Sequence, residues 1–253
     1  MIDAHIHLEQ YEHADTAIEN WMKAGVKKVV AVSNDLASSY RTLELKEKYP
    51  EFILAGVGFH PEKGLPHERD VEEWENLIAQ ERDQIACVGE VGLPHYKLEH
   101  LGEPFEEHIA FLTRCVHTAS KYELPVALHA VHDKAKTAYD ILQKEAPELS
   151  AHFHWLKAEA SVVQSITDAG YYVSLTPEVC YRKRDQELAK RLPHRQLLIE
   201  TDGPWPFQGP FARRQTTPLF LKEVAACAAD TIGESADFFY KQTVRNTLRL
   251  YGG

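Results

Sequence analysis

The chain has 253 residues, of which 44% are hydrophobic and 26% are charged, with 13 glycines and 13 prolines. These values are typical of a globular protein, and they exclude a disordered, collagen-like or low-complexity chain. The formal net charge of −10 argues against a protein that coats duplex nucleic acid through a broad basic surface, but it leaves local engagement of a strand end open.

Short β-branched runs alternate with longer amphipathic stretches from one end of the chain to the other. The expected strands cover residues 1–6, 28–33, 52–58, 84–89, 125–129, 150–154, 171–175 and 196–200. The expected helices cover residues 16–24, 36–49, 71–82, 106–121, 134–145, 160–169 and 186–191, and two more follow at 220–231 and 237–249.

Several expected strands, such as residues 28–33, are apolar with little alternation, which is typical of parallel strands covered on both faces. Eight strand–helix repeats in about 250 residues predict the α/β class and a (β/α)8 TIM barrel. A doubly wound open sheet is the alternative. No linker rich in glycine and serine interrupts the chain, so we expect residues 1–253 to form a single domain.

The cysteines and the first residues bear on the cellular compartment. Cys87, Cys115, Cys180 and Cys227 stand singly, so we expect reduced thiols in the core of a cytoplasmic protein. The opening MIDAHIHLEQ carries an acid and two histidines where a signal peptide needs an apolar segment. No apolar run approaches the length of a membrane span, so we expect no membrane partner.

The first expected strand carries His5 and His7, which project to the same side because residues two apart on a strand share a face. Two imidazoles placed in this way can bind one metal ion. An isolated H-x-H segment is more often a pair of ordinary polar residues, so the interpretation depends on the rest of the chain.

Other expected strands also end in histidines or carboxylates. These residues are His60, Glu90, His129, His152, His154, Glu200 and Asp202. Strand ends of a barrel meet at one mouth, so we expect these side chains to gather there. The set suffices for two divalent ions, and Zn, Mn, Fe or Ni suit histidine-rich ligands better than Mg does. It predicts metal-assisted hydrolysis, because an ion pair can activate water and stabilise the attacking and leaving oxygens.

A loop broken by proline and glycine, GPWPFQGPFARRQTTP, follows the eighth strand and should overhang the same mouth. Arg213 and Arg214 in this loop are candidate contacts for an anionic substrate. Trp205 is a candidate substrate contact that could stack on a base, although packing in the wall of the mouth is the favoured interpretation for a single aromatic ring there. The basic run at residues 182–184 is expected to lie in solvent.

Six motifs resemble, in order and spacing, those of the TatD family of metal-dependent hydrolases. They are DAHIHL at residues 3–8, GFHP at 58–61, GEVGL at 89–93, PVALH at 125–129, ETDGP at 200–204 and NTLRLY at 246–251. Each motif is weak alone, but the ordered set spans nearly the whole chain. The resemblance implies a (β/α)8 barrel and a deoxyribonuclease of exonuclease type.

The resemblance also implies roles for the motif residues. His5 and His7 would bind one ion, Glu90 would bridge two ions, and His129 and His154 would bind the second. Asp202 would coordinate the first ion and orient or deprotonate the attacking water, and His60 would contact the leaving group or the scissile phosphate. His154 is preferred to His152 because the segment HWL resembles the family's H-C-F, although both lie on the same side of the strand.

The departures from the family pattern fall on residues expected to face the substrate. They are Pro94, Ala130, Val131, Lys157, Ala158 and the segment TTP at 216–218. Val131 stands where an arginine suited to phosphate is usual. The resemblance and the ligand set make cleavage of a DNA strand end the leading hypothesis. Two alternatives stay open: an amidohydrolase or esterase acting on a small molecule, which the missing arginine favours, and a catalytically silent metal-binding protein. The choice among Zn, Mn, Mg, Fe and Ni and the oligomeric state stay open.

Overall fold

The computed structural model describes residues 1–252 and contains a sheet of eight parallel strands in the sequential order β1 to β8. The strands are β1 (Ile2–Ile6), β2 (Lys28–Ala31), β3 (Ile53–Val57), β4 (Ile85–Gly92), β5 (Val126–His129), β6 (Ala151–Phe153), β7 (Tyr172–Leu175) and β8 (Leu197–Ile199). A parallel bridge between Ile6 and Gly203 brings the first strand to the end of the last. The predicted (β/α)8 barrel is confirmed.

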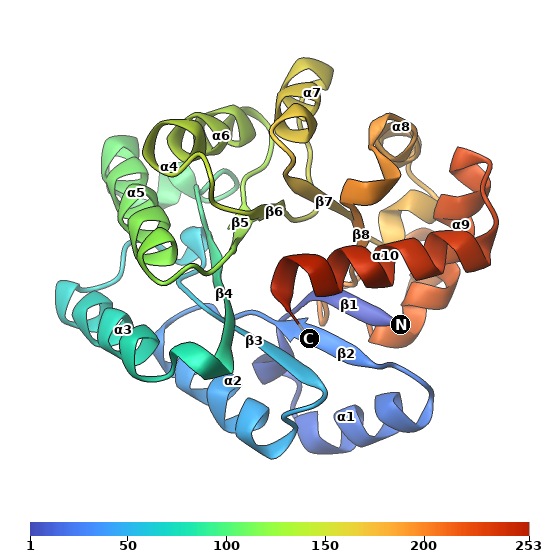
Figure 1. Ribbon diagram of the computed structural model, residues 1–253, viewed down its shortest axis with the longest axis horizontal. Helices are drawn as coiled ribbons and strands as arrows, with labels where there is room; N and C mark the ends of the chain where they lie inside the picture. Colours follow the sequence, from blue (N-terminus) through green and yellow to red (C-terminus); the bar gives the residue numbers. More distant parts are fainter. Residues whose placement is uncertain (253) are drawn as a thin grey trace.

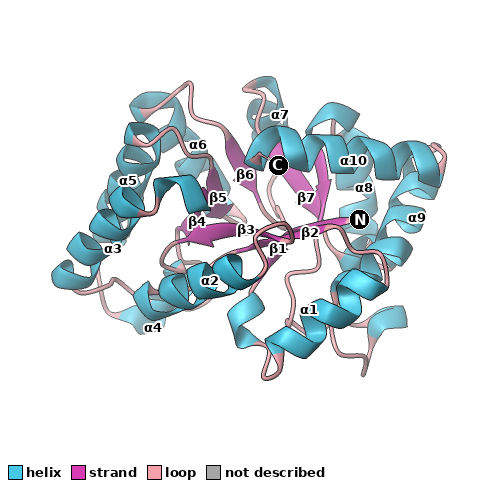
Figure 2. Cartoon of the chain, turned by 60° about the horizontal axis from the view of Figure 1, so that its bottom comes forward, coloured by secondary structure: helices cyan, strands magenta, loops and turns pink. Residues whose placement is uncertain are grey.

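The helices lie around the outside of the strands, as Figures 1 and 2 show. They are α1 (Ala14–Lys23), α2 (Leu36–Lys48), α3 (Glu68–Gln80), α4 (Leu98–Leu101), α5 (Phe105–Lys121), α6 (Asp133–Glu145), α7 (Ala160–Asp168), α8 (Lys183–Arg191), α9 (Leu221–Ile232) and α10 (Ala236–Tyr251). None of the helices in the described part of the chain is both long and apolar enough to cross a membrane.

The main core lies between the strands and these helices. On α5, for example, Leu112, Cys115, Val116 and Ala119 are buried, a spacing of three and four residues that forms one apolar stripe. The strands are buried along almost their whole length, which explains their continuous apolar sequences. Polar residues are therefore concentrated at the carboxyl ends of the strands, which form the mouth of the barrel.

The boundaries differ from the expected ones in two informative places. Strand β4 extends to Gly92, past the expected end at residue 89, so Glu90 is part of the strand rather than of the loop. Helix α8 begins at Lys183 instead of residue 186. The basic run at 182–184 is exposed, as expected, although Arg184 pairs with Glu178 at 2.5 Å and with Asp185 at 2.7 Å.

The expectation of four reduced thiols is wrong for one pair. Cys180, which follows β7, forms a disulfide with Cys227 of α9, and their Cα atoms are 5.2 Å apart. The two cysteines are 47 residues apart in sequence, and they meet because the segment after β7 packs against α9. Cys87 and Cys115 are free and buried, as expected.

Candidate metal centre

Strands β1 and β8 are joined at the mouth by the side chain of Asp3. Its carboxylate accepts the backbone N–H of Thr201 at 3.0 Å and the hydroxyl of the same residue at 2.5 Å. The N–H of Asp202 donates to the carbonyl of His5 at 3.0 Å. These bonds bring Asp202 beside the two histidines of the opening motif.

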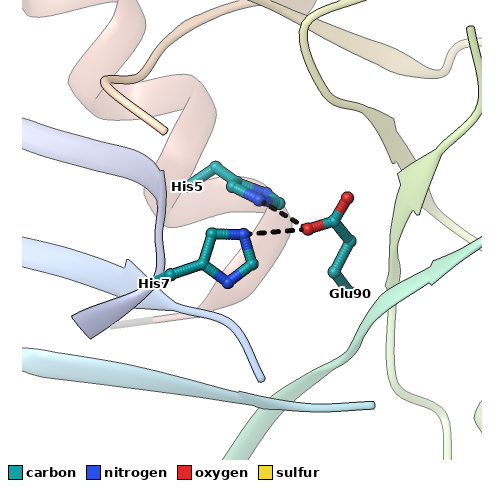
Figure 3. A group of neighbouring side chains, drawn as sticks. All are labelled: His5, His7 and Glu90. Carbon is teal, nitrogen blue, oxygen red and sulfur yellow. Dashed lines mark hydrogen bonds and ion pairs between the residues drawn. The ribbon is translucent and has the colours of Figure 1, made fainter. Parts of the chain in front are cut away.

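His5, His7, Glu90 and Asp202 form the first group of metal-ligand atoms. The Nε2 atoms of His5 and His7 each lie 3.1 Å from Glu90 Oε2 and 3.6 Å from Asp202 Oδ1. In Figure 3 both rings point at the same carboxylate oxygen. Two ligands at zinc-like distances in a tetrahedral site are about 3.4 Å apart, so these separations suit one ion.

The second group of metal-ligand atoms uses the other oxygen of the same carboxylate. Glu90 Oε1 lies 2.9 Å from His129 Nδ1 and 3.0 Å from His154 Nε2. The two imidazole nitrogens are 3.4 Å apart. Glu90 therefore presents one oxygen to each group, which is the geometry of a bridging ligand.

Polar neighbours face the far sides of three of these imidazoles. His7 Nδ1 lies 3.1 Å from the amide nitrogen of Asn34, and His154 Nδ1 lies 3.3 Å from Glu200 Oε1. His129 Nε2 is 3.4 Å from Glu62 Oε1. Such outer partners fix the orientation and tautomer of metal-binding histidines.

Glu62 is a site residue that the sequence analysis missed. Its carboxylate accepts the backbone N–H groups of His95, Tyr96 and Lys97 at 2.7, 2.9 and 2.7 Å. Although burial opposes ionisation, His129 and these N–H groups lower the pKa of Glu62 to about 2. The available signal was an acid two residues after His60 at the end of a strand. Asn34, at the end of the second strand, was missed in the same way.

His152 occupies the layer beneath this centre. The Tyr251 hydroxyl is hydrogen-bonded to His152 Nδ1 at 2.7 Å, and His152 Nε2 lies 3.6 Å from Glu200 Oε2. Burial lowers the pKa of His152 to about 3, so its ring is neutral. Within residues 1–252, His5 Nδ1, His152 Nε2 and Glu200 Oε2 are buried without a hydrogen-bond partner, and these residues form a further group able to hold an ion. His154, not His152, is the residue beside Glu90.

His60 lies at the edge of the second group. Its Nδ1 accepts the N–H of Glu62 at 3.1 Å, which leaves Nε2 as the N–H donor. That Nε2 lies 3.5 Å from Glu90 Oε1. Burial lowers the pKa of His60 to about 3, so the ring stays neutral and offers a hydrogen bond toward the mouth.

The imidazoles and the carboxylates of the cluster shift one another's pKa values. Burial alone would raise the pKa of Glu90, but the surrounding imidazoles, including His60, His154 and His5, hold it well below its usual value. Burial raises the pKa of Asp202, which also adopts a left-handed φ of 48°. A non-glycine residue in that region is strained, and such residues cluster at functional sites.

The candidate substrate residues belong to the loop after β8, which begins beside the cluster: the N–H of Trp205 donates to the carbonyl of Asp202 at 3.0 Å. Arg214 pairs with Glu223 at 2.8 Å and stands 4.4 Å over the ring of Phe220. Trp205 is 57% exposed and lies edge-on to Trp155, with the ring centroids 6.2 Å apart. Arg213 has a left-handed φ of 62° and makes no polar side-chain contact within residues 1–252. Substrate contact by these residues stays a prediction.

A barrel mouth lined by buried imidazoles and bridged by a carboxylate defines the class of the protein: a metal-dependent hydrolase. The comparisons with known proteins identify the family. The family described as "TatD related DNase" matches residues 2–252. A relative from Haemophilus influenzae, an "Uncharacterized metal-dependent hydrolase", is 35% identical over 253 residues, covering 99% of each chain.

Two further matches agree. The human "Deoxyribonuclease TATDN3" is 28% identical over 262 residues, covering 99% of this chain and 94% of its own. The crystal structure of YJJV, a TatD homologue from Escherichia coli K12, superposes with a TM-score of 0.88 at 22% identity, covering 100% of this chain and 98% of that one. The chain belongs to the TatD family of metal-dependent hydrolases, and is a hydrolase that acts on ester bonds. The predicted resemblance is confirmed.

Proposed function

We propose that this hydrolase holds two divalent ions and cleaves phosphodiester bonds at the end of a nucleic acid strand. The observation that carries the proposal is the position of Glu90: Oε2 lies 3.1 Å from two imidazole nitrogens of the opening motif, and Oε1 lies within 3.0 Å of two imidazole nitrogens at the ends of β5 and β6. The human relative is named a deoxyribonuclease, which supports a nucleic acid substrate.

We assign the ligand residues to two ions by the distances between their ligand atoms. His5, His7 and Asp202 would hold the first ion, and His129 and His154 the second, with Glu90 shared by both. Bound there, the ions would make water a nucleophile near neutral pH and offset the negative charge that develops on the phosphodiester. All of the ligand types suit Zn, Mn, Fe or Ni, and the carboxylates also allow Mg.

The side chains of the protein supply binding and proton transfer. The side chain of Asp202 is 11% exposed while that of Glu90 is fully buried, so Asp202 is the cluster carboxylate that water reaches and the one that would take its proton. Neutral His60 would donate its Nε2–H to a phosphate oxygen or to the leaving group. Trp205, Arg213 and Arg214 are proposed to contact the substrate beyond the scissile bond.

The test pairs metal analysis with hydrolysis of end-labelled single-stranded DNA by the metal-loaded protein. We expect about two ions per chain, release of nucleotides from one end, and loss of at least a thousandfold in rate for Asp202→Ala and Glu90→Gln. His117→Ala is the matched control, because His117 is exposed on α5 and, within residues 1–252, pairs with Glu145 alone.

The alternative small-molecule activity is tested by the same preparation on amides, lactones and simple esters. The proposal would be replaced by the small-molecule activity if the protein turned over one of these substrates, lost this turnover in His5→Ala and left DNA intact. Retained metal without hydrolysis of any substrate would favour the silent metal-binding protein.

A further inference from the structure

Lys157, in the loop after β6, is a cation at the mouth that makes no ion pair with a carboxylate in the described part of the chain. Its Nζ donates to the hydroxyl of Tyr96 at 2.9 Å and stands 4.2 Å from the ring centroid of Trp155. Within residues 1–252, no carboxylate oxygen lies within 4.0 Å of this nitrogen. In contrast, Lys63 and Lys134, near the same strand ends, pair with Asp35 at 2.8 Å and with Asp133 at 2.6 Å.

The neighbours of Lys157 hold it in place. The indole N–H of Trp155 donates to Glu178 Oε2 at 3.1 Å, which fixes the ring that lies under the ammonium group. Tyr96 is held by Glu62, because the backbone N–H groups of His95 and of Tyr96 itself both donate to the Glu62 carboxylate. A cation held by an aromatic face and a hydroxyl keeps its charge available for an anion.

This cation lies close to the proposed metal centre. The ring centroid of Tyr96 is 6.3 Å from that of His129, and Trp155 follows His154 in the chain. Lys157 therefore stands one side chain away from the ligands of the second ion. A lysine in this position is placed to contact a phosphate next to the scissile one.

Two exposed aromatic rings flank the lysine. Trp205 and Tyr96 are 57% and 55% exposed, the highest values among the large apolar side chains of the described chain. Trp205 lies beside Trp155, and Tyr96 contacts Lys157. Exposed aromatic rings next to a basic group are typical of surfaces on which unpaired bases stack.

We propose that Lys157, Tyr96 and Trp205 form a binding site, the rim site, for the nucleotide next to the scissile phosphate of a single-stranded nucleic acid. Lys157 contacts the adjoining phosphate, and Trp205 or Tyr96 stacks on an unpaired base. The proposal rests on the proposed phosphodiesterase function and narrows its substrate to a strand of at least two nucleotides with unpaired bases.

The first test compares a fluorescent single-stranded oligonucleotide with bis(p-nitrophenyl) phosphate, a diester without a neighbouring phosphate. We expect Lys157→Gln to lower kcat/KM about tenfold more for the oligonucleotide than for the small diester, and Lys157→Arg to restore most of the loss. Lys136→Gln is the control, because Lys136 is exposed on α6 and its one ion pair in the described part of the chain is with Asp140.

The second test measures binding without turnover. The anisotropy of a phosphorothioate oligonucleotide that resists cleavage is followed as salt increases. Lys157→Gln should reduce the slope of log affinity against log salt by about 0.7, the value of one phosphate contact on a single strand. Trp205→Ala should weaken binding about tenfold with the slope unchanged, because stacking carries no counterion release. The same measurement with single-stranded DNA, single-stranded RNA and a blunt DNA duplex identifies which kind of nucleic acid binds. The duplex should bind most weakly.

The outcomes separate the two proposals. Equal losses on both substrates, or an unchanged salt slope in Lys157→Gln, would overturn the rim site and leave the phosphodiesterase proposal standing. Oligonucleotide binding that depends on Lys157, without hydrolysis of either substrate by the metal-loaded protein, would support the rim site and overturn the proposed catalytic function.

Discussion

Glu62 joins the loop after β3 to the loop after β4, and its replacement is the sharpest test of the interactions that hold the mouth together. The substitution Glu62→Gln keeps the shape of the side chain and removes its charge. The fall of the pKa of Glu62 from 4.5 to about 2 corresponds to a contribution of about 3 kcal/mol at pH 7. Only the charge-dependent part of the three N–H bonds is lost, so this figure is an upper value.

The sign of the pH dependence follows from the direction of this shift. A carboxyl group with a lowered pKa in the folded state stabilises the protein fully above its unfolded pKa of about 4.5, and this contribution fades as the pH falls toward 2. The difference in unfolding free energy between the wild type and Glu62→Gln should therefore fall from about 3 kcal/mol at pH 7 to about 2 kcal/mol at pH 3.5.

The assay is urea unfolding of the metal-free protein at both pH values, so that metal affinity does not enter the comparison. At neutral pH the melting temperature should also fall by about 6 to 12 °C. Glu72→Gln, on the exposed face of α3, is the matched control and should change little. A loss below about 0.5 kcal/mol, or a difference that does not shrink in acid, would refute the reasoning.

Three further predictions concern other parts of the molecule. Tyr251→Phe removes the hydroxyl bonded to buried His152 and should cost about 1–3 kcal/mol in urea unfolding, with less loss in the double variant Tyr251→Phe/His152→Phe. Cys180→Ser should cost about 4 kcal/mol under oxidising conditions, the value for a 47-residue loop, and nothing once dithiothreitol reduces the wild type. Asp185→Asn should stabilise the protein at pH 7, because burial raises the pKa of Asp185 to about 6; the gain should disappear below pH 4, and a constant gain would contradict this cause.

The barrel and most of the metal cluster could be predicted because strand periodicity and strand-end chemistry are local in sequence. His5 and His7 lie on one strand, and the rule that parallel strand ends meet brought Glu90, His129, His154 and Asp202 to the same mouth. The preference for His154 over His152 agrees with the 3.0 Å distance between His154 Nε2 and Glu90 Oε1.

Contacts between distant residues could not be predicted in the same way. The bond of Tyr251 to His152 joins residues 99 apart, and no periodicity indicates which strand the last helix touches. In the sequence Glu62 looks like any other acidic residue, because its role depends on backbone N–H groups of the loop after β4, which is distant in the chain. The disulfide was missed because Cys180 and Cys227 come together only through the packing of α9.

The contact of Tyr251 with His152 has a consequence for how the protein is handled. Helix α10 ends at this tyrosine, and only His152 and Glu200 separate its hydroxyl from the imidazole of His154. A tag or fusion partner that unwinds the last helical turn would therefore disturb a residue deep in the barrel. Weak metal binding by such a preparation would then result from the disturbed last turn of α10 and not from the metal ligands themselves.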